Sequence, residues 1–186
     1  MAKAKKAPIY QLKITLRGSK PPIWRRFVVP GSITLPTLHE VIQIVMGWTD
    51  SHLHEFVSGR ISYGVPDPEW PSGARNEARA RLNQLLQREK QKLLYMYDFG
   101  DGWEHSLELE KIIPGDSLSP KPKCIAGKRA CPPEDCGGIY GYYDLLDALK
   151  DPENPEHEDM IEWLGGDFDP EYFDIDEINE MLSSLK

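Results

Sequence analysis

The sequence predicts an α+β fold, in which a mainly antiparallel sheet carries helices packed on one face and the C-terminal third is helical. Apolar and polar residues alternate in the first 30 residues and again between residues 93 and 113, which is typical of strands with one buried face. One clear helical period separates these regions, at residues 37–46. The other strong helical periods all follow residue 141.

The first two predicted strands cover residues 9–17 and 23–29. In the first strand every second residue is apolar, and in the second Ile23, Phe27 and Val29 share one face. Residues 18–22 contain a glycine and two prolines, which favour a turn. We therefore expect the two strands to pair as a hairpin-like unit.

The helix predicted at residues 37–46 follows the i, i+3, i+4 spacing of a buried stripe. Thr37 and Glu40 match a capping box, and Gly47 stands where a left-handed residue would end the helix. A third strand is expected at residues 52–58. Residues 64–76 are expected to be a loop, and the basic segment 78–92 to be helical in part.

Two further strands, at residues 93–98 and 103–113, flank a Gly-Asp-Gly turn at residues 100–102. The run at residues 93–97 is too apolar for an edge strand, so this hairpin is expected at the centre of the sheet. Residues 114–138 are rich in Pro, Gly and Lys and are expected to be irregular.

The last third predicts three helices. The first covers residues 142–149, and the second has Asn154 as N-cap, Pro155 as first residue and Leu164 near its end. Asp174 and Glu177 resemble a capping box for a third helix that reaches Leu185.

Length and composition favour one domain over residues 1–186. The chain has a net charge of −8, and 40% of its residues are hydrophobic, enough for a core. It has no apolar run of about 20 residues and no secretory h-region, and its three cysteines do not suggest a disulfide framework. We expect a cytoplasmic protein without a membrane partner.

Charge is unevenly distributed along the chain. Residues 1–30 contain eight Lys or Arg and no acidic residue, whereas residues 151–186 contain thirteen acidic residues and one Lys. The favoured interpretation is that the acidic block folds near the basic strands and partly neutralises them, because the negative net charge repels nucleic acid. The alternative is a basic face for nucleic acid, with contacts from Lys20, Arg25 and Arg26 and at least two exposed basic side chains between residues 22 and 26.

Histidines and aspartates gather in two short segments. On a strand, His52 and His54 would project from one face and could share a metal ion or bracket a substrate, although a polar sheet face would also explain them. Around the predicted turn, a role as turn formers would by itself explain Asp98 and Asp101. If the two segments meet, they form a candidate pocket suited to a hydrolytic metal site: His52, His54, Asp98, Asp101, Trp103 and His105.

The three cysteines, Cys124, Cys131 and Cys136, have the spacing C-x6-C-x4-C. Neither gap is the C-x2-C of a strong zinc motif, so free thiols are the favoured interpretation and zinc held with one histidine is the alternative. Gly137-Gly138 before a helix could admit an anion, a weak signal without a phosphate-loop pattern. The sequence contains no G-x-S-x-G, H-E-x-x-H or dinucleotide-binding fingerprint.

Several motifs, in order along nearly the whole chain, resemble the plasmid pRiA4b ORF-3-like family. The resemblance implies a single-domain α+β protein of a prokaryote, of a kind sometimes encoded on plasmids or transposable elements, and it assigns no catalytic role to any residue. The similar segments are Leu12-Lys13-Ile14 through Pro21 to Arg26, Leu38-His39, Gly47-Trp48, His52 to Phe56, Tyr97 to His105, Cys131 to Gly138 and Gly166 to Pro170.

Two classes of function follow from the residues and the resemblance. The first is a binding or accessory protein linked to plasmids or mobile elements. The second is a hydrolytic, metal-assisted enzyme that uses the His/Asp pocket. The proximity of the candidate pocket side chains in the fold distinguishes the two classes.

Overall fold

The computed structural model describes residues 7–67, 73–115 and 121–185. The described strands form one eight-stranded sheet in the order β5-β4-β3-β6-β7-β1-β2-β8, antiparallel except for the pair β4–β5. The strands are β1 (Ile9–Leu16), β2 (Trp24–Pro30), β3 (His54–Ser58), β4 (Ile61–Gly64), β5 (Arg75–Asn76), β6 (Lys92–Tyr97), β7 (Trp103–Ile113) and β8 (Lys123–Lys128).

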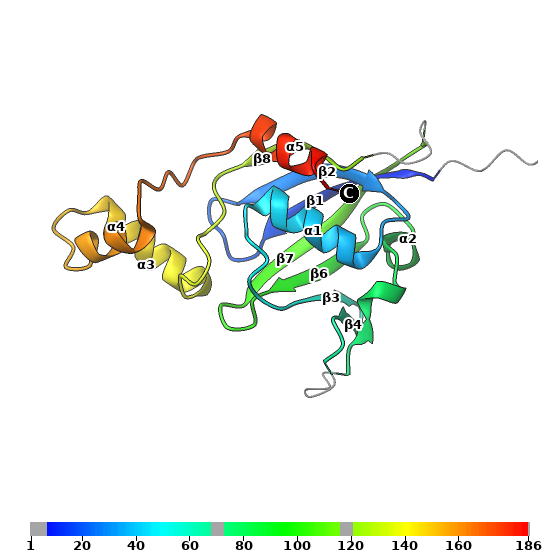
Figure 1. The fold of residues 1–186 in the computed structure, drawn as a ribbon, viewed down its shortest axis with the longest axis horizontal. Helices are drawn as coiled ribbons and strands as arrows, with labels where there is room; N and C mark the ends of the chain where they lie inside the picture. The colour runs from blue at the N-terminus through cyan, green and yellow to red at the C-terminus, as the bar shows by residue number, and fades with distance from the viewer. Residues whose placement is uncertain (1–6, 68–72, 116–120, 186) are drawn as a thin grey trace, which may run out of the picture.

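Helices α1 (Leu35–Met46) and α5 (Ile175–Ser183) lie over one face of this sheet, whereas α3 (Gly138–Lys150) and α4 (His157–Leu164) extend from one end of it (Figure 1). The short helices η1 (Glu77–Arg79) and α2 (Leu82–Leu85) follow β5. The predicted α+β class, with a mainly antiparallel sheet and helices in the last third, is confirmed.

The core lies between the sheet and α1. Leu12, Ile14 and Phe27 are fully buried beneath the helix, as the period-two pattern predicts. Strands β1 and β2 pair antiparallel, and β6 and β7 are each paired on both sides, so the predicted central hairpin is confirmed.

The helix α1 begins earlier than predicted. Its N-cap is Thr34, whose hydroxyl accepts a hydrogen bond from the Thr37 amide, so the expected capping box at Thr37 and Glu40 is wrong. Leu35 and Pro36 occupy the first turn, where proline needs no hydrogen-bond donor. Gly47 ends the helix in the left-handed conformation with φ 96°, as expected.

Several segments differ from the prediction. Strand β8 lies within residues 114–138, which were expected to be irregular, and β4 and β5 lie within or beside the predicted loop at residues 64–76. The middle parts of both predicted loops, at 68–72 and 116–120, lie outside the described residues, as do residues 1–6 of the basic block. The sequences of β8 and β4 show no clear alternation of apolar and polar residues. These strands form because their main chains pair with β2 and β3.

The three C-terminal helices were predicted in the right order, but the starts of the first two were wrong. Helix α3 begins at Gly138, four residues early, and α4 begins at His157 after a turn in which Asn154 accepts from the Glu156 amide. Asp174 caps α5 as expected, accepting from the amides of Asp176 and Glu177.

The face of the sheet opposite α1 is polar, and several of its charges are paired. Arg17 lies 2.8 Å from Glu104, Arg26 lies 2.6 Å from Glu110, and Lys92 lies 2.9 Å from Glu108. These pairs neutralise three cationic groups on this face.

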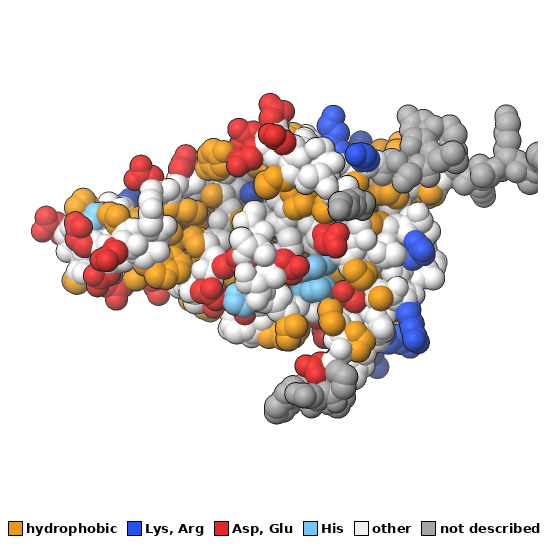
Figure 2. Space-filling model, in the orientation of Figure 1, with side chains coloured by type: hydrophobic (Ala, Val, Ile, Leu, Met, Phe, Trp, Pro, Cys, Tyr) orange, Lys and Arg blue, Asp and Glu red, His pale blue; other side chains and the backbone are white. Residues whose placement is uncertain are grey.

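The acidic residues 151–186 do not neutralise the basic N-terminal strands by direct pairing. Among the described residues, the acidic block forms its ion pair through Glu171, and the partner is Arg129, which lies outside the N-terminal block. Asp and Glu side chains instead gather on the surface over α3, α4 and α5 (Figure 2). Helix α5 of the acidic block does pack on β8, which pairs with the basic strand β2, so the intramolecular interpretation stays a prediction that direct ion pairs do not carry.

Candidate functional site

The β6–β7 turn places one carboxylate beside a histidine and uses part of it for structure. Asp98 has a positive φ of 54°, and its Oδ1 accepts from the amides of Gly100 at 2.9 Å and Asp101 at 3.4 Å. The expected turn-forming role of Asp98 is confirmed. Its second oxygen, Oδ2, is directed toward His52, with 3.7 Å between Oδ2 and the Nε2 atom.

His52 lies in the segment before β3, not inside the strand as predicted. Its Nε2 atom is 3.2 Å from Asp135 Oδ1 and is shielded from solvent, yet it has no hydrogen bond of acceptable geometry with a described residue. One potential ligand atom from each of His52, Asp98 and Asp135 lies within 4.8 Å of the other two. We call these three residues the His52 cluster.

The segment 131–138 brings Asp135 to this cluster because it docks on the ends of the sheet and α1. Trp48 donates through Nε1 to the Pro132 carbonyl at 3.1 Å, and the Tyr97 hydroxyl donates to Glu134. Asp135 itself has a positive φ of 60°, a conformation that aspartate tolerates better than most residues.

Asp101 has a structural partner and lies outside the His52 cluster. Its Oδ2 accepts from the Gly137 amide at 3.1 Å, which ties the hairpin turn to the segment 131–138. Gly137 and Gly138 both have positive φ, and a Cβ on Gly138 would lie 2.3 Å from the Asp101 carbonyl oxygen. The two glycines therefore serve this close approach of two backbones.

We expect Asp101→Ala to lower the free energy of unfolding by about 1 kcal/mol, because the Gly137 amide loses a charged acceptor. Chemical denaturation measures this difference. Asp101→Asn retains an acceptor oxygen and should lose less. A variant as stable as the wild type would show that the contact contributes nothing to stability.

His54 belongs to a different, buried group. It lies on β3 facing α1, and its Nε2 atom is 2.9 Å from Glu77 Oε2. Its ring stacks on that of His39, with centroids 3.4 Å apart and planes 6° from parallel. His39 in turn bonds to the Tyr95 hydroxyl at 2.8 Å and to Asp50 at 2.7 Å. His39, a functional candidate missed in the sequence, stands within the buried stripe of α1.

His39, Asp50 and His54 also satisfy the distance criterion for a metal site, but their geometry suits one poorly. Imidazole binds an ion in the plane of its ring, and two rings stacked face to face do not direct their nitrogens at one point. Burial lowers the pKa of His39, and the neighbouring charge of His54 lowers it further, against the opposing effect of Asp50. This group is best described as a hydrogen-bonded core network.

Trp103 and His105 lie on β7, on the same sheet face as His54. Both are buried, and neither Trp103 Nε1 nor His105 Nε2 has a hydrogen-bond partner among the described residues. The predicted agreement of faces therefore holds, because Tyr97 lies across from both His54 and Trp103 in the sheet. Complete burial lowers the pKa of His105 to about 4.

The buried His105 predicts acid sensitivity. Its pKa falls from 6.5 in the unfolded chain to about 4 in the folded one, so below pH 6.5 the unfolded state binds a proton that the folded state does not. The free energy of unfolding should therefore decrease as the pH is lowered, and this group accounts for about 2 kcal/mol of the decrease by pH 5. Denaturation of His105→Leu at pH 8 and pH 5 should show a loss smaller by that amount than the wild type's. Equal losses would contradict the assignment.

The expected nucleic-acid contacts are arranged differently from the prediction. Arg25 is 3% exposed because it faces α1, so the expectation of an exposed contact there is wrong. Arg26 is on the opposite face and forms two hydrogen bonds with Glu110. Lys20 is exposed in the turn between β1 and β2. One of the three expected basic contacts thus remains available.

The three cysteines are free thiols in the structure. Cys124 is buried in β8, and Cys131 and Cys136 lie in the segment before α3. Burial raises the pKa of the Cys136 thiol to about 12. Of the ligand groups found among the described residues, none contains a cysteine.

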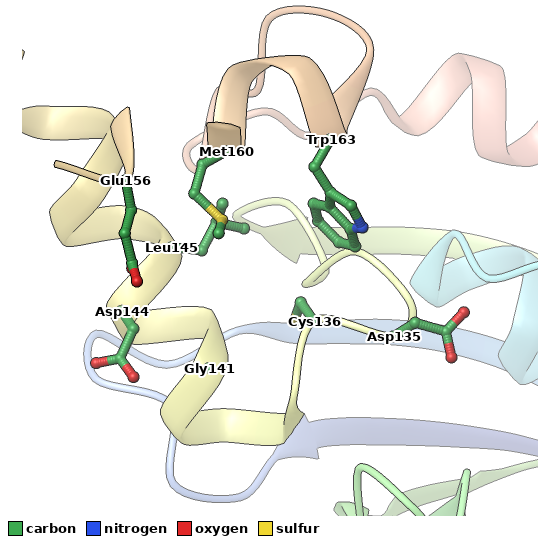
Figure 3. Close-up of a pocket in the computed structure, with 8 residues that line it drawn as sticks. All are labelled: Asp135, Cys136, Gly141, Asp144, Leu145, Glu156, Met160 and Trp163. Atoms are coloured by element: carbon green, nitrogen blue, oxygen red, sulfur yellow. The ribbon is translucent and has the colours of Figure 1, made fainter. Parts of the chain in front are cut away.

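A cavity of about 270 Å³ lies beside the His52 cluster, between the segment 131–138 and helices α3 and α4 (Figure 3). Leu145, Met160 and Trp163 supply its apolar surface. Asp135 lines the cavity, but its carboxylate points away from the interior, consistent with its contact to His52 (Figure 3).

These features define an α+β protein with one polar open sheet face and a His/Asp cluster at the end of its central hairpin. Residues 8–177 match the family described as plasmid pRiA4b ORF-3-like protein, and the chain belongs to this family. Within the described residues, no helix combines the length and apolar character needed to cross a bilayer.

Two relatives extend the comparison. The chain is 40% identical over 181 residues to the uncharacterized protein y4hQ of Sinorhizobium fredii, covering 96% of this chain and 93% of that protein. It is 42% identical to the crystal structure of a protein of unknown function, MM3350, from Methanosarcina mazei, with a TM-score of 0.82 over 92% of this chain and 98% of the other.

Proposed function

We propose that this protein is a binding protein that holds a divalent metal ion at the His52 cluster. The distances at His52 Nε2 carry the proposal: 3.2 Å to Asp135 and 3.7 Å to Asp98. Ligand atoms about 2.1 Å from a tetrahedral ion lie about 3.4 Å apart. The observed separations are on either side of this value.

The hydrogen bonding of Asp98 and of His52 supports the same interpretation. Asp98 uses Oδ1 for the turn, and the structure gives Oδ2 no hydrogen bond among the described residues. His52 Nε2 lies beside two carboxylates without a hydrogen bond to either. A histidine that served only as an ion-pair partner would be expected to donate to one of them.

Three protein ligands leave at least one coordination position for a bound molecule. An anionic group could complete the coordination, which gives a binding protein its ligand contact. The family description connects the chain to a plasmid-encoded protein, and an accessory role on such elements is part of this proposal.

A metal-assisted hydrolase is the second candidate. It is favoured by the donor set of one histidine and two carboxylates, which leaves coordination positions for water. The ion at this site would supply an activated water.

Calorimetric titration with Zn²⁺ and Mn²⁺ tests the proposal. We expect one ion per chain, and at least tenfold weaker binding in Asp98→Asn and Asp135→Asn. Asparagine suits both positions, because it tolerates positive φ and keeps an acceptor oxygen for the turn. Asp50→Asn is the matched control and should bind as the wild type does. Unchanged affinity in the two cluster variants, or no stoichiometric binding, would reject the site.

A further inference from the structure

A buried arginine near the start of β2 has no anionic partner among the described residues. Arg25 donates through Nε to the Val45 carbonyl at 2.7 Å, and through Nη1 to the carbonyls of Trp24 at 2.9 Å and Lys128 at 3.0 Å. In the described part of the chain, Nη2 has no acceptor and no carboxylate forms an ion pair with Arg25. The Val45 carbonyl lies at the C-terminal end of α1, where the helix dipole favours a cation.

These contacts do not neutralise the charge. Carbonyl groups carry partial charges, and the ring of Phe173, 4.9 Å from the Arg25 guanidinium carbon, offers a weak cation–π contact. An arginine stays protonated in proteins, and a buried charge is normally paired. The site therefore holds an uncompensated positive charge beneath the helices.

Arg25 lines a cleft of about 440 Å³ between α1, α5 and residues 130–131. Most of the remaining lining is apolar, with Val45, Trp48, Phe173 and Met181 among the contributing residues. Gly127 makes room for this arrangement, because a Cβ there would lie 2.4 Å from Phe173 and 2.8 Å from Arg25. The cleft is within the size range of small-molecule sites.

Two carboxylates on the rim of the cleft are already engaged. Asp174 accepts from the first amides of α5, and Glu177 accepts from the Tyr172 hydroxyl at 2.8 Å. Neither of them pairs with Arg25. Their negative charge would disfavour a ligand with several anionic groups more than a ligand with one.

We propose that this cleft binds a small molecule with one carboxylate and an apolar body, with the carboxylate paired to Arg25. A carboxylate that accepts from Nη2, the guanidinium nitrogen without an acceptor, would give the buried cation its missing counter-charge. The apolar body would cover the surfaces of Trp48, Phe173 and Met181. This site is separate from the His52 cluster and does not depend on metal binding there.

Calorimetry with octanoate and with octanol, which has the same chain length and no charge, tests the proposal. We expect octanoate to bind at least tenfold more tightly than octanol to the wild type. Arg25→Gln should remove this preference. Met181→Trp, which narrows the cleft from an exposed position on α5, should weaken both ligands at least tenfold.

The second variant keeps the test decisive if Arg25→Gln does not fold, because Met181 is 40% exposed and its replacement leaves Arg25 in place. Ile161→Trp, at a similarly exposed position on α4, is the matched control and should bind octanoate as the wild type does. Equal affinity for octanoate and octanol in the wild type, or unchanged octanoate binding in Met181→Trp, would overturn the proposal.

Discussion

Replacement of Glu77 by alanine is expected to lower the free energy of unfolding by about 3 kcal/mol. Glu77 is 4% exposed and its Oε2 atom is 2.9 Å from His54 Nε2, beneath α1. The variant leaves His54 buried without its acceptor and opens a cavity where the carboxylate was. Urea denaturation at pH 7 measures the difference.

Two variants control for this effect. Glu77→Gln keeps the shape and one hydrogen bond and should cost about 1 kcal/mol. Glu40→Ala removes an exposed carboxylate from α1 and should change stability by less than about 0.5 kcal/mol. If Glu77→Ala were no less stable than Glu40→Ala, the stacked histidines would not depend on their carboxylate.

Gly138→Ala is expected to destabilise the fold by about 3 kcal/mol, from a residue that has no side chain to lose. The backbone there has a φ of 70°, and an added Cβ would lie 2.3 Å from the Asp101 carbonyl oxygen. Left-handed strain and overlap with a backbone atom each cost on the order of 1–2 kcal/mol. Thermal unfolding followed by circular dichroism measures the loss.

The matched control is Gly166→Ala. A Cβ added to this glycine would meet no atom within 4 Å, and its φ is not positive, so the replacement should be nearly neutral. Gly138→Ala should also weaken metal binding, because Asp135 reaches His52 from the same segment. A Gly138→Ala protein as stable as Gly166→Ala would mean that the two backbones can separate without cost.

The parts of the fold that were predicted correctly are those whose signal lies in a few neighbouring residues. Alternation in Tyr10, Leu12 and Ile14 reports one buried sheet face, and the spacing from Leu38 to Met46 reports one buried helix face. Strand β8 escaped prediction because its residues join the sheet by pairing with β2, and the pattern of Lys123 to Lys128 contains no alternation of its own.

The candidate site was predicted only in part, because its members come from distant segments. His52 and Asp98 were predicted, but Asp135 enters from a Pro-rich segment whose path depends on contacts with Trp48 and Tyr97. Arg25 shows the opposite error. The two adjacent arginines were predicted to form one basic patch. Because side chains alternate along a strand, Arg25 lies in the core and Arg26 lies on the open face.

Helix α4 contains no buried residue, whereas α3 buries Tyr142, Leu145 and Ala148. The two walls of the cavity in Figure 3 therefore differ in how firmly they are attached to the sheet. Local opening free energies follow the buried apolar contacts that hold an element, so amide hydrogens of α4 should exchange with solvent long before those of α3 or the central strands. A subglobal fluctuation of α4 would therefore widen the cavity, while the segment 131–138 on its other side stays fixed to the core.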